Sequence, residues 1–144
     1  EAVGGCAAQA VRKNLKLTAS YGEIPAGAFD QGHLQKIVRN LIAFSVARMN
    51  CGEIILKTST GGASLHIEVE DDGPSMSAAE LNDVVEPPEE QRKGGSPSLG
   101  IYVAKVLART SGGWLRAFPS GERGVRFAAE IPPATPAQIA AAAQ

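Results

Sequence analysis

The 144-residue sequence has few aromatic side chains, little net charge and no long apolar run. Aromatic residues make up 5% of the chain, so its core must consist mostly of aliphatic side chains. The net charge of -1 argues against an unaided binder of nucleic acid, because phosphate binding requires a basic face. No apolar run approaches the roughly 18–20 residues of a membrane-spanning helix, and we expect no direct membrane contact.

Cysteine is scarce as well, since the chain contains only Cys6 and Cys51. Two thiols without CxxC spacing indicate neither a metal site nor a disulfide scaffold, and we expect both to be small buried residues. The length suits one domain, for which we expect residues 1–132, followed by a Pro/Ala-rich linker over residues 133–144. No signal peptide is visible, and we expect the chain to be an excised domain.

Hydrophobic periodicity divides the sequence into helices and strands. Residues 14–21 and 64–70 alternate between apolar and polar side chains, which is typical of half-buried strands. We expect the apolar side chains at alternate positions of 64–70 and 124–131 to point inward: Leu65, Ile67, Val69, Val125, Phe127, Ala129 and Ile131. Residues 31–49 and 99–110 instead repeat their apolar side chains at helical spacing. In chain order we expect a helix over 2–13, a strand over 14–21, a helix over 31–49, strands over 53–59 and 64–70, a short helix over 77–85, a loop over 86–98, a helix over 99–110, and strands over 114–118 and 124–131.

The long helix in this order has predictable ends and two different faces. Asp30 can accept from the free N–H groups of the first turn, and Gly52 suits a left-handed stop at the other end. Asn40, Phe44 and Ala47 form a narrow stripe, so we expect Phe44 to lie outside the main core. The opposite, broad face carries the apolar residues Leu34, Ile37, Val38, Leu41, Ile42, Ser45, Val46 and Met49.

The later helix and the element order complete the predicted architecture. The order of helices and strands indicates an α+β fold: a two-layer α/β sandwich with a mixed, mostly antiparallel sheet and helices on one face. The helix over 99–110 carries an apolar stripe of Leu99, Val103, Val106, Leu107 and Thr110.

Four local segments follow one another at a characteristic spacing. They are RNLIAFSVARMNCGEI at 39–54, EVEDDGPSM at 68–76, the segment from VVEPPEE to SGGWL at 84–115, and GVRFAAEIP at 124–132. In this order they resemble the N-box, the adenine-contacting box, the ATP lid with its glycine-rich box, and the closing strand of the catalytic and ATP-binding domain of bacterial sensor histidine kinases. The resemblance covers nearly the whole chain and implies the Bergerat fold, which gyrase and MutL share.

The resemblance implies nucleotide-site roles for four residues that the sequence retains. Asp71 corresponds to the carboxylate that accepts a hydrogen bond from the adenine amino group. Gly73 would let the backbone approach the base, since it has no Cβ. Asn40 takes the first of two N-box asparagine positions, and Gly100 is the remaining glycine of the glycine-rich box. Without the resemblance, the Asp-Asp-Gly-Pro run at 71–74 would be interpreted as a turn.

Five positions of the same site depart from the family pattern. Phe44 stands where a second asparagine holds Mg²⁺, which takes about six hard oxygen ligands, and a phenyl ring supplies none. Ala47 replaces a lysine, and the adjacent Arg48 is a poor substitute because it points about 100° away around the helix. Ser75 replaces a glycine. Ser96 and Ser98 stand where glycines cradle phosphate, and the proline between them removes a backbone donor. We therefore expect weak or no binding of Mg-ATP and assign no metal ligand.

The histidines do not complete a phosphoryl-transfer site. His33 and His66 lack the acidic and proline neighbours of a phosphoacceptor histidine, so no catalytic residue is assigned. The resemblance implies an ATP-binding-type domain with an altered nucleotide site and a regulatory or docking role in phosphorelay signalling, like degenerate pseudokinases of the DivL type. The alternative is an active kinase domain that binds ATP and phosphorylates a histidine on a separate dimerisation domain. A third interpretation, an anti-sigma-factor serine kinase, also requires the magnesium asparagine, which Phe44 replaces.

The resemblance also implies partners and a location. The expected partners are the dimerisation and phosphoacceptor helices of the same protein, and a response regulator or another histidine kinase. The expected location is the cytoplasm, alone or as part of a membrane-anchored sensor kinase.

Overall fold

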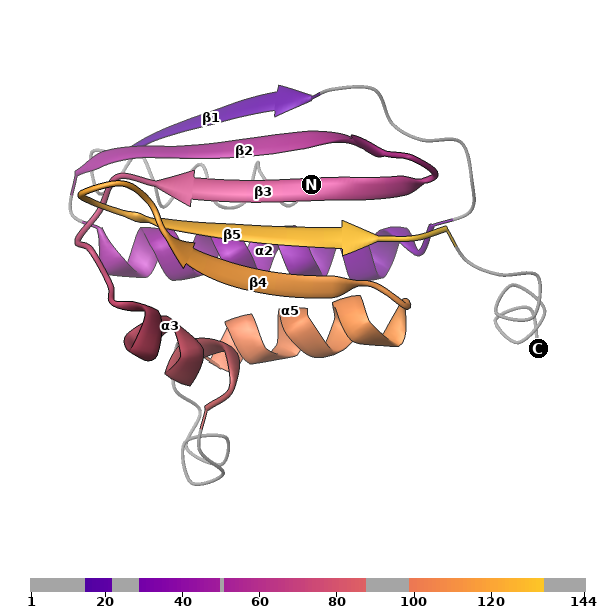
Figure 1. The fold of residues 1–144 in the computed structure, drawn as a ribbon. Coiled ribbons are helices and arrows are strands. Elements are labelled where there is room, and N and C mark those ends of the chain that lie inside the picture. The colour runs from indigo at the N-terminus through magenta and orange to yellow at the C-terminus, as the bar shows by residue number, and fades with distance from the viewer. Residues whose placement is uncertain (1–14, 22–28, 50, 88–98, 134–144) are drawn as a thin grey trace.

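The computed structural model describes residues 15–21, 29–49, 51–87 and 99–133. The expected helix over 2–13 and nearly all of the expected linker lie outside the described residues. The described elements are β1 (Leu15–Tyr21), α2 (Gln31–Arg48), β2 (Gly52–Gly61), β3 (Ser64–Asp71), α3 (Ala78–Val85), α5 (Leu99–Thr110), β4 (Trp114–Pro119) and β5 (Val125–Ile131) (Figure 1).

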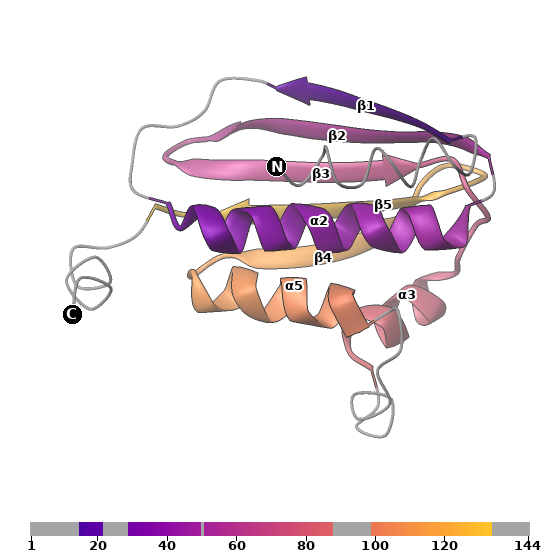
Figure 2. The same ribbon diagram turned by 180° about the vertical axis from the view of Figure 1, so that it is seen from behind.

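The five described strands form one sheet in the order β1-β2-β3-β5-β4. β1 runs parallel to β2, whereas the other neighbouring strands pair in antiparallel fashion. Helices α2 and α5 lie side by side on one face of the sheet, and α3 lies beside the N-terminal end of α5 (Figures 1 and 2). This arrangement confirms the predicted α+β fold, a two-layer sandwich with a mixed, mostly antiparallel sheet.

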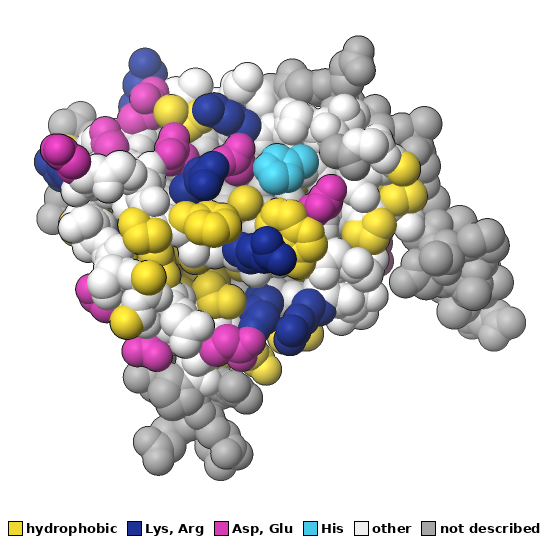
Figure 3. Space-filling model, in the orientation of Figure 1, with side chains coloured by type: hydrophobic (Ala, Val, Ile, Leu, Met, Phe, Trp, Pro, Cys, Tyr) yellow, Lys and Arg dark blue, Asp and Glu magenta, His cyan; other side chains and the backbone are white. Residues whose placement is uncertain are grey.

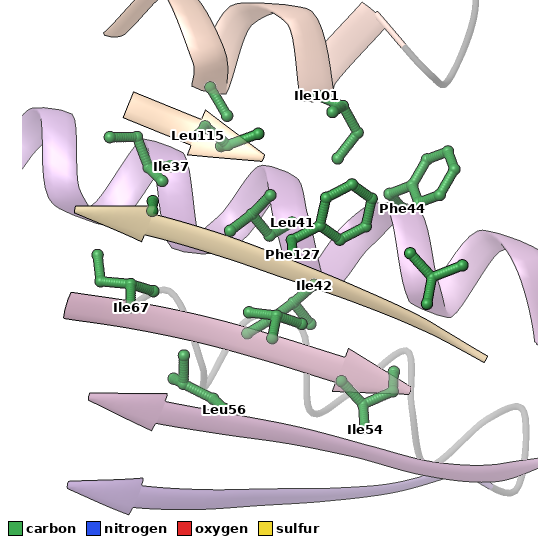
Figure 4. Close-up of a cluster of buried hydrophobic side chains, with 14 of the residues drawn as sticks. Ile37, Leu41, Ile42, Phe44, Ile54, Leu56, Ile67, Ile101, Leu115 and Phe127 are labelled. Atoms are coloured by element: carbon green, nitrogen blue, oxygen red, sulfur yellow. The ribbon is translucent and has the colours of Figure 1, made fainter. Parts of the chain in front are cut away.

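The core lies between the sheet and the helices, where aliphatic side chains from both layers meet (Figure 4). Each fully buried aliphatic or phenyl side chain contributes about 1.5–3 kcal/mol to folding, so this layer supplies most of the stability. The inward side chains are buried as the alternation predicted: Leu65, Ile67 and Val69 on β3, and Val125, Phe127, Ala129 and Ile131 on β5.

The N-termini of α2 and α3 are capped by side chains, and the cap of α2 by Asp30 was predicted. The Asp30 carboxylate accepts from the backbone N–H of His33 at 3.0 Å. At α3, the Ser77 hydroxyl accepts from the Glu80 N–H at 3.1 Å, and the Glu80 carboxylate accepts in return from the Ser77 N–H at 3.2 Å. This reciprocal pair is a capping box, which satisfies two N–H groups that the helix itself leaves free.

The C-terminal end of α2 differs from the prediction. Met49 is the C-cap and is already extended, with φ -104°, while its N–H still bonds to the Ser45 carbonyl at 3.1 Å. Gly52 does have a positive φ of 119°, but it is the first residue of β2 and not the helix stop. The predicted left-handed stop was wrong because the chain leaves the helix directly in an extended conformation.

The buried face of α5 also differs from the predicted stripe. Val106 is 43% exposed and Thr110 is exposed, although both were expected to be buried. The true buried face includes two alanines, which a search for large apolar side chains overlooks. The buried residues of α5 are Ile101, Ala104, Lys105 and Ala108.

The face of the sheet that points away from α2 and α5 carries arginines stacked on aromatic rings (Figure 3). Arg116 lies 4.7 Å from the centroid of the Trp114 ring, and Arg126 lies 5.0 Å from that of Phe118. Such stacking lets aromatic side chains remain half-exposed while their faces are covered by a cation.

Two expectations about the chain's surface can be compared with the described residues. Cys51 is exposed, so its predicted burial was wrong, and Cys6 lies outside the described residues. Cys51 immediately precedes β2 in the chain. In the part of the chain that the structure describes, no helix is long and apolar enough to cross a membrane.

Candidate functional site

Asp71, the last residue of β3, has a fully buried side chain that accepts hydrogen bonds from four donors. Its Oδ1 accepts from the backbone N–H groups of Gly73 at 3.1 Å and Val125 at 3.2 Å. Its Oδ2 accepts from the Ser45 hydroxyl at 2.6 Å and from Arg48 Nη1 at 2.7 Å. An ionised carboxylate offers about four acceptor sites, so the internal donors saturate Asp71.

The fold brings these donors together from three elements. Ser45 and Arg48 are three residues apart on α2, which places them on the same side of the helix. Val125 opens β5, and the residue before it, Gly124, has a positive φ of 92°. A Cβ on Gly124 would lie 1.8 Å from the Asp71 carbonyl oxygen, so only glycine permits this approach of the two strands.

Arg48 is the one charged donor among the four. Its side chain is 14% exposed and forms an ion pair with Asp71. Nη2 of the same guanidinium donates to the Pro74 carbonyl oxygen, and Cζ lies 5.6 Å from the centroid of the Phe44 ring. The guanidinium thus joins the end of β3 to the turn that follows it.

Phe44 lies in the main core, contrary to the expectation from its helical stripe. It is 7% exposed, and its ring meets the Phe127 ring edge to face, with centroids 5.5 Å apart and planes at 88° (Figure 4). The prediction was wrong because it assumed that α2 is covered on one side only. The neighbouring helix α5 packs against α2 as well, so the sheet and α5 together enclose a wider face.

The other predicted site residues divide between the interior and the surface. Asn40 is partly buried and adjoins Gly100, where an added Cβ would lie 3.5 Å from Asn40 Cγ. Ala47 and Ser75 are exposed. Ser96 and Ser98 lie outside the described residues.

Gly73 is buried, and the space beside it is filled by protein. A Cβ at this position would lie 2.6 Å from Cγ of Met49, a residue that is 1% exposed. The missing side chain of Gly73 therefore makes room for Met49 at the end of α2.

A family model described as "Histidine kinase-, DNA gyrase B-, and HSP90-like ATPase" matches residues 29–135 of the chain. The chain belongs to this family. The sensor protein TorS of Escherichia coli (strain K12) is 29% identical over 117 residues, which are 80% of this chain and 13% of TorS. The chain therefore spans 13% of the length of this curated relative and corresponds to an ATPase-type domain of the family.

Solved structures share the fold of this histidine-kinase ATPase-type domain. Full-length ShkA in complex with AMPPNP superposes with a TM-score of 0.79 at 21% identity, covering 93% of this chain and 29% of ShkA. The nucleotide-free catalytic domain of the histidine kinase ThkA superposes with a TM-score of 0.75 at 16% identity, covering 92% of this chain and 88% of that domain. These matches agree with the predicted two-layer architecture.

Domains of this family generally bind ATP with magnesium, so the residues at the corresponding position can be compared with that requirement. At the expected ligand position this domain has the buried phenyl ring of Phe44, which has no oxygen to offer a hard cation. In the described ranges, no three His, Cys, Asp or Glu side chains are grouped to hold a metal ion. The residues on this part of α2 do not fit a magnesium site.

Sequence reasoning missed Ser45 and Arg48 as partners of Asp71. Ser45 was assigned to the apolar face of the helix, and Arg48 was considered only as a poor substitute for a lysine. One signal was present, because a hydroxyl on an otherwise apolar face requires a buried partner. The sequence did not identify Asp71 as that partner, because Ser45 and Asp71 are 26 positions apart.

A small cleft lies on the side of the sheet that α2 and α5 do not cover. Its volume is about 140 Å³, below the roughly 300–1,000 Å³ of common ligand pockets. Ser120 donates to the Glu70 carboxylate at 2.5 Å across its rim. The cleft is lined by Glu53, Ile55, Glu70, Asp71, Asp72, Ser120 and Arg123.

Lys105 is a buried cation that the predictions did not include. Its ammonium contacts the carboxylate of Glu86, the C-cap of α3. Burial lowers the pKa of Lys105, and the nearby charge of Arg109 lowers it further. Glu86 does not reverse this direction, because its side chain is 46% exposed and water screens its charge.

Proposed function

We propose that this chain is the ATP-binding-type domain of a two-component sensor histidine kinase with an altered nucleotide site. In this proposal the domain binds Mg-ATP weakly or not at all and acts in phosphorelay signalling through regulation and docking. The observation that carries the proposal is the burial of Phe44 against Phe127 at the position of the family's metal ligand.

The expected loss of affinity for Mg-ATP is large enough to separate an altered site from a functional one in a binding experiment. A charge-assisted hydrogen bond contributes roughly 1.5–3 kcal/mol. Losing the metal ligand at Phe44 and the phosphate partner at Ala47 costs on the order of 4 kcal/mol, even with partial compensation elsewhere. This difference is about a thousandfold in Kd, which turns a roughly micromolar site into a roughly millimolar one.

The docking part of the proposal follows from the family membership and from the relative TorS, whose name describes a sensor protein. The partners would be the dimerisation and phosphoacceptor helices of the same protein, together with a response regulator or another histidine kinase. The domain would lie in the cytoplasm, within a membrane-anchored sensor.

Calorimetric titration with a non-hydrolysable ATP analogue, with and without Mg²⁺, tests the proposal. We expect a Kd no tighter than about 1 mM and no gain on adding Mg²⁺. Micromolar, magnesium-dependent binding would refute the proposal. Phe44→Asn should restore a magnesium effect in a folded protein, and Phe44→Leu serves as the matched control, since it opens the same space without an oxygen ligand.

The second candidate is an active kinase domain that binds ATP and phosphorylates a histidine on a separate dimerisation domain. The contact between Asn40 and Gly100 favours it, because two retained nucleotide-site positions lie together. This candidate predicts magnesium-dependent autophosphorylation of the full-length protein, which the first candidate predicts to be absent.

A further inference from the structure

At the position expected to recognise the adenine base, the carboxylate of Asp71 already accepts hydrogen bonds from donors of the domain itself. Under the proposed function, Asp71 occupies the position whose carboxylate accepts from an adenine amino group, and that hydrogen bond requires a free acceptor oxygen. Gly73 and Val125 supply two backbone donors to Oδ1, and the fold fixes both of them. The two remaining donors, on Oδ2, are side chains of α2.

We propose that Arg48 is an internal ligand of Asp71 that competes with the adenine amino group and thereby excludes the base from this domain. The inference rests on the proposed function for the role of Asp71, and it goes beyond the loss of magnesium and phosphate contacts. In this proposal Arg48 determines whether the adenine base can bind, whereas Phe44 determines whether Mg²⁺ can bind.

The geometry favours Arg48 over an incoming base as the partner of Oδ2. The guanidinium nitrogen lies 2.7 Å from Oδ2, and a bond between two ionised groups is stronger than one from a neutral amine. The side chain of Asp71 is fully buried and that of Arg48 is 14% exposed, so salt screens the pair only weakly.

Two further contacts fix the guanidinium in this position. Nη2 donates to the Pro74 carbonyl oxygen, which ties Arg48 to the turn after Gly73. The cation also lies over the Phe44 ring. Met49 occupies the space beside Gly73 in the same turn. Arg48 and Met49 together hold the turn against the end of α2.

Adenosine is the probe that isolates this effect, because it has the base and lacks the phosphates. Arg48→Met removes every donor and keeps a long stem over Phe44, whereas Arg48→Lys keeps the charge and loses the planar fork. Arg39→Met is the matched control, since Arg39 is exposed on the same helix. Binding is measured by calorimetry and by the rise in Tm on adding adenosine, which reports binding to a destabilised variant too.

We expect Arg48→Met to bind adenosine at least tenfold more tightly than the wild type, with Arg48→Lys in between and Arg39→Met unchanged. Adding Asp71→Asn to Arg48→Met should abolish the gain. A folded Arg48→Met or Arg48→Lys protein with no gain would overturn the proposal. Adenosine binding by the wild type that Asp71→Asn abolishes would overturn it as well.

The two proposals fail in different experiments. Tight Mg-ATP binding by a wild type that does not bind adenosine would refute the proposed function through its metal and phosphate contacts. Adenosine binding by the wild type without any magnesium effect would refute the role of Arg48 and leave the proposed function standing.

Discussion

Arg48 donates from Nη1 to Oδ2 of Asp71 at 2.7 Å, and this ion pair joins the last turn of α2 to the end of β3. Ser45, one turn earlier on the helix, donates to the same oxygen. The carboxylate that was expected to accept from adenine is therefore bound by internal donors in this domain. Its energetic weight is open to measurement.

Arg48→Met should lower the free energy of unfolding by about 3–5 kcal/mol, because it leaves Asp71 as a buried charge without its cation. Urea unfolding of Arg48→Met, Asp71→Asn and the double variant forms a cycle, in which the double variant should lose less than the sum of the single losses. Arg39→Met should change stability by no more than about 0.5 kcal/mol. Strict additivity would mean that the ion pair contributes nothing to stability.

Phe44→Ala should cost about 3–5 kcal/mol in urea unfolding, because it removes a buried phenyl ring and its edge-to-face contact with Phe127. Phe118→Ala, on the half-exposed face of β4, is the control and should cost clearly less. A cost for Phe44→Ala below about 1 kcal/mol would instead support the original expectation that Phe44 lies outside the main core.

The contrast between these two phenylalanines shows how far the sequence predicts this fold. Alternation predicted the inward side chains of β3 and β5, because successive side chains of a strand point to opposite faces of the sheet. This holds whichever elements pack against those faces. The same logic failed for Phe44, since the buried width of a helix depends on how many neighbours pack against it. The sequence predicts α5 but not its position beside α2, so its true buried face was missed too.

The candidate site was predictable in part for a related reason. Asp71, Gly73, Asn40 and Gly100 were predicted as site residues because local motifs resemble the family, and that assignment stays a prediction. The pairing of Arg48 with Asp71 joins residues 23 positions apart, and neither helical nor strand spacing encodes it. Only the packing of α2 against the end of β3 brings the two together.

Gly124→Ala should be strongly destabilising, by more than the roughly 1 kcal/mol that a positive φ alone costs an alanine. The new Cβ would fall 1.8 Å from the Asp71 carbonyl oxygen, so β5 would have to move away from β3. Gly121→Ala is the matched control, because Gly121 has a φ of 59° with no atom near its Cβ position. Thermal unfolding compares the two, and equal losses would contradict a steric role for the contact with Asp71.

Lys105 gives the domain a predictable dependence of stability on pH. Burial lowers its pKa, so the folded protein binds fewer protons at this site than the unfolded chain. The charged form therefore destabilises the fold at pH 7. This cost shrinks as the pH rises through the lowered pKa toward the ordinary lysine value of about 10.4.

Lys105→Met keeps the buried stem and removes the charge, so it should be at least as stable as the wild type at pH 7. The difference between the two free energies of unfolding should fall as the pH is raised from 7 to 10, because the wild type loses its buried charge over this range. Urea unfolding at several pH values measures this difference, and Lys57→Met, at an exposed position of β2, controls for the general loss of a charge. If Lys105→Met is instead less stable at pH 7, the contact with Glu86 outweighs the cost of burial, and the α3–α5 junction depends on that ion pair.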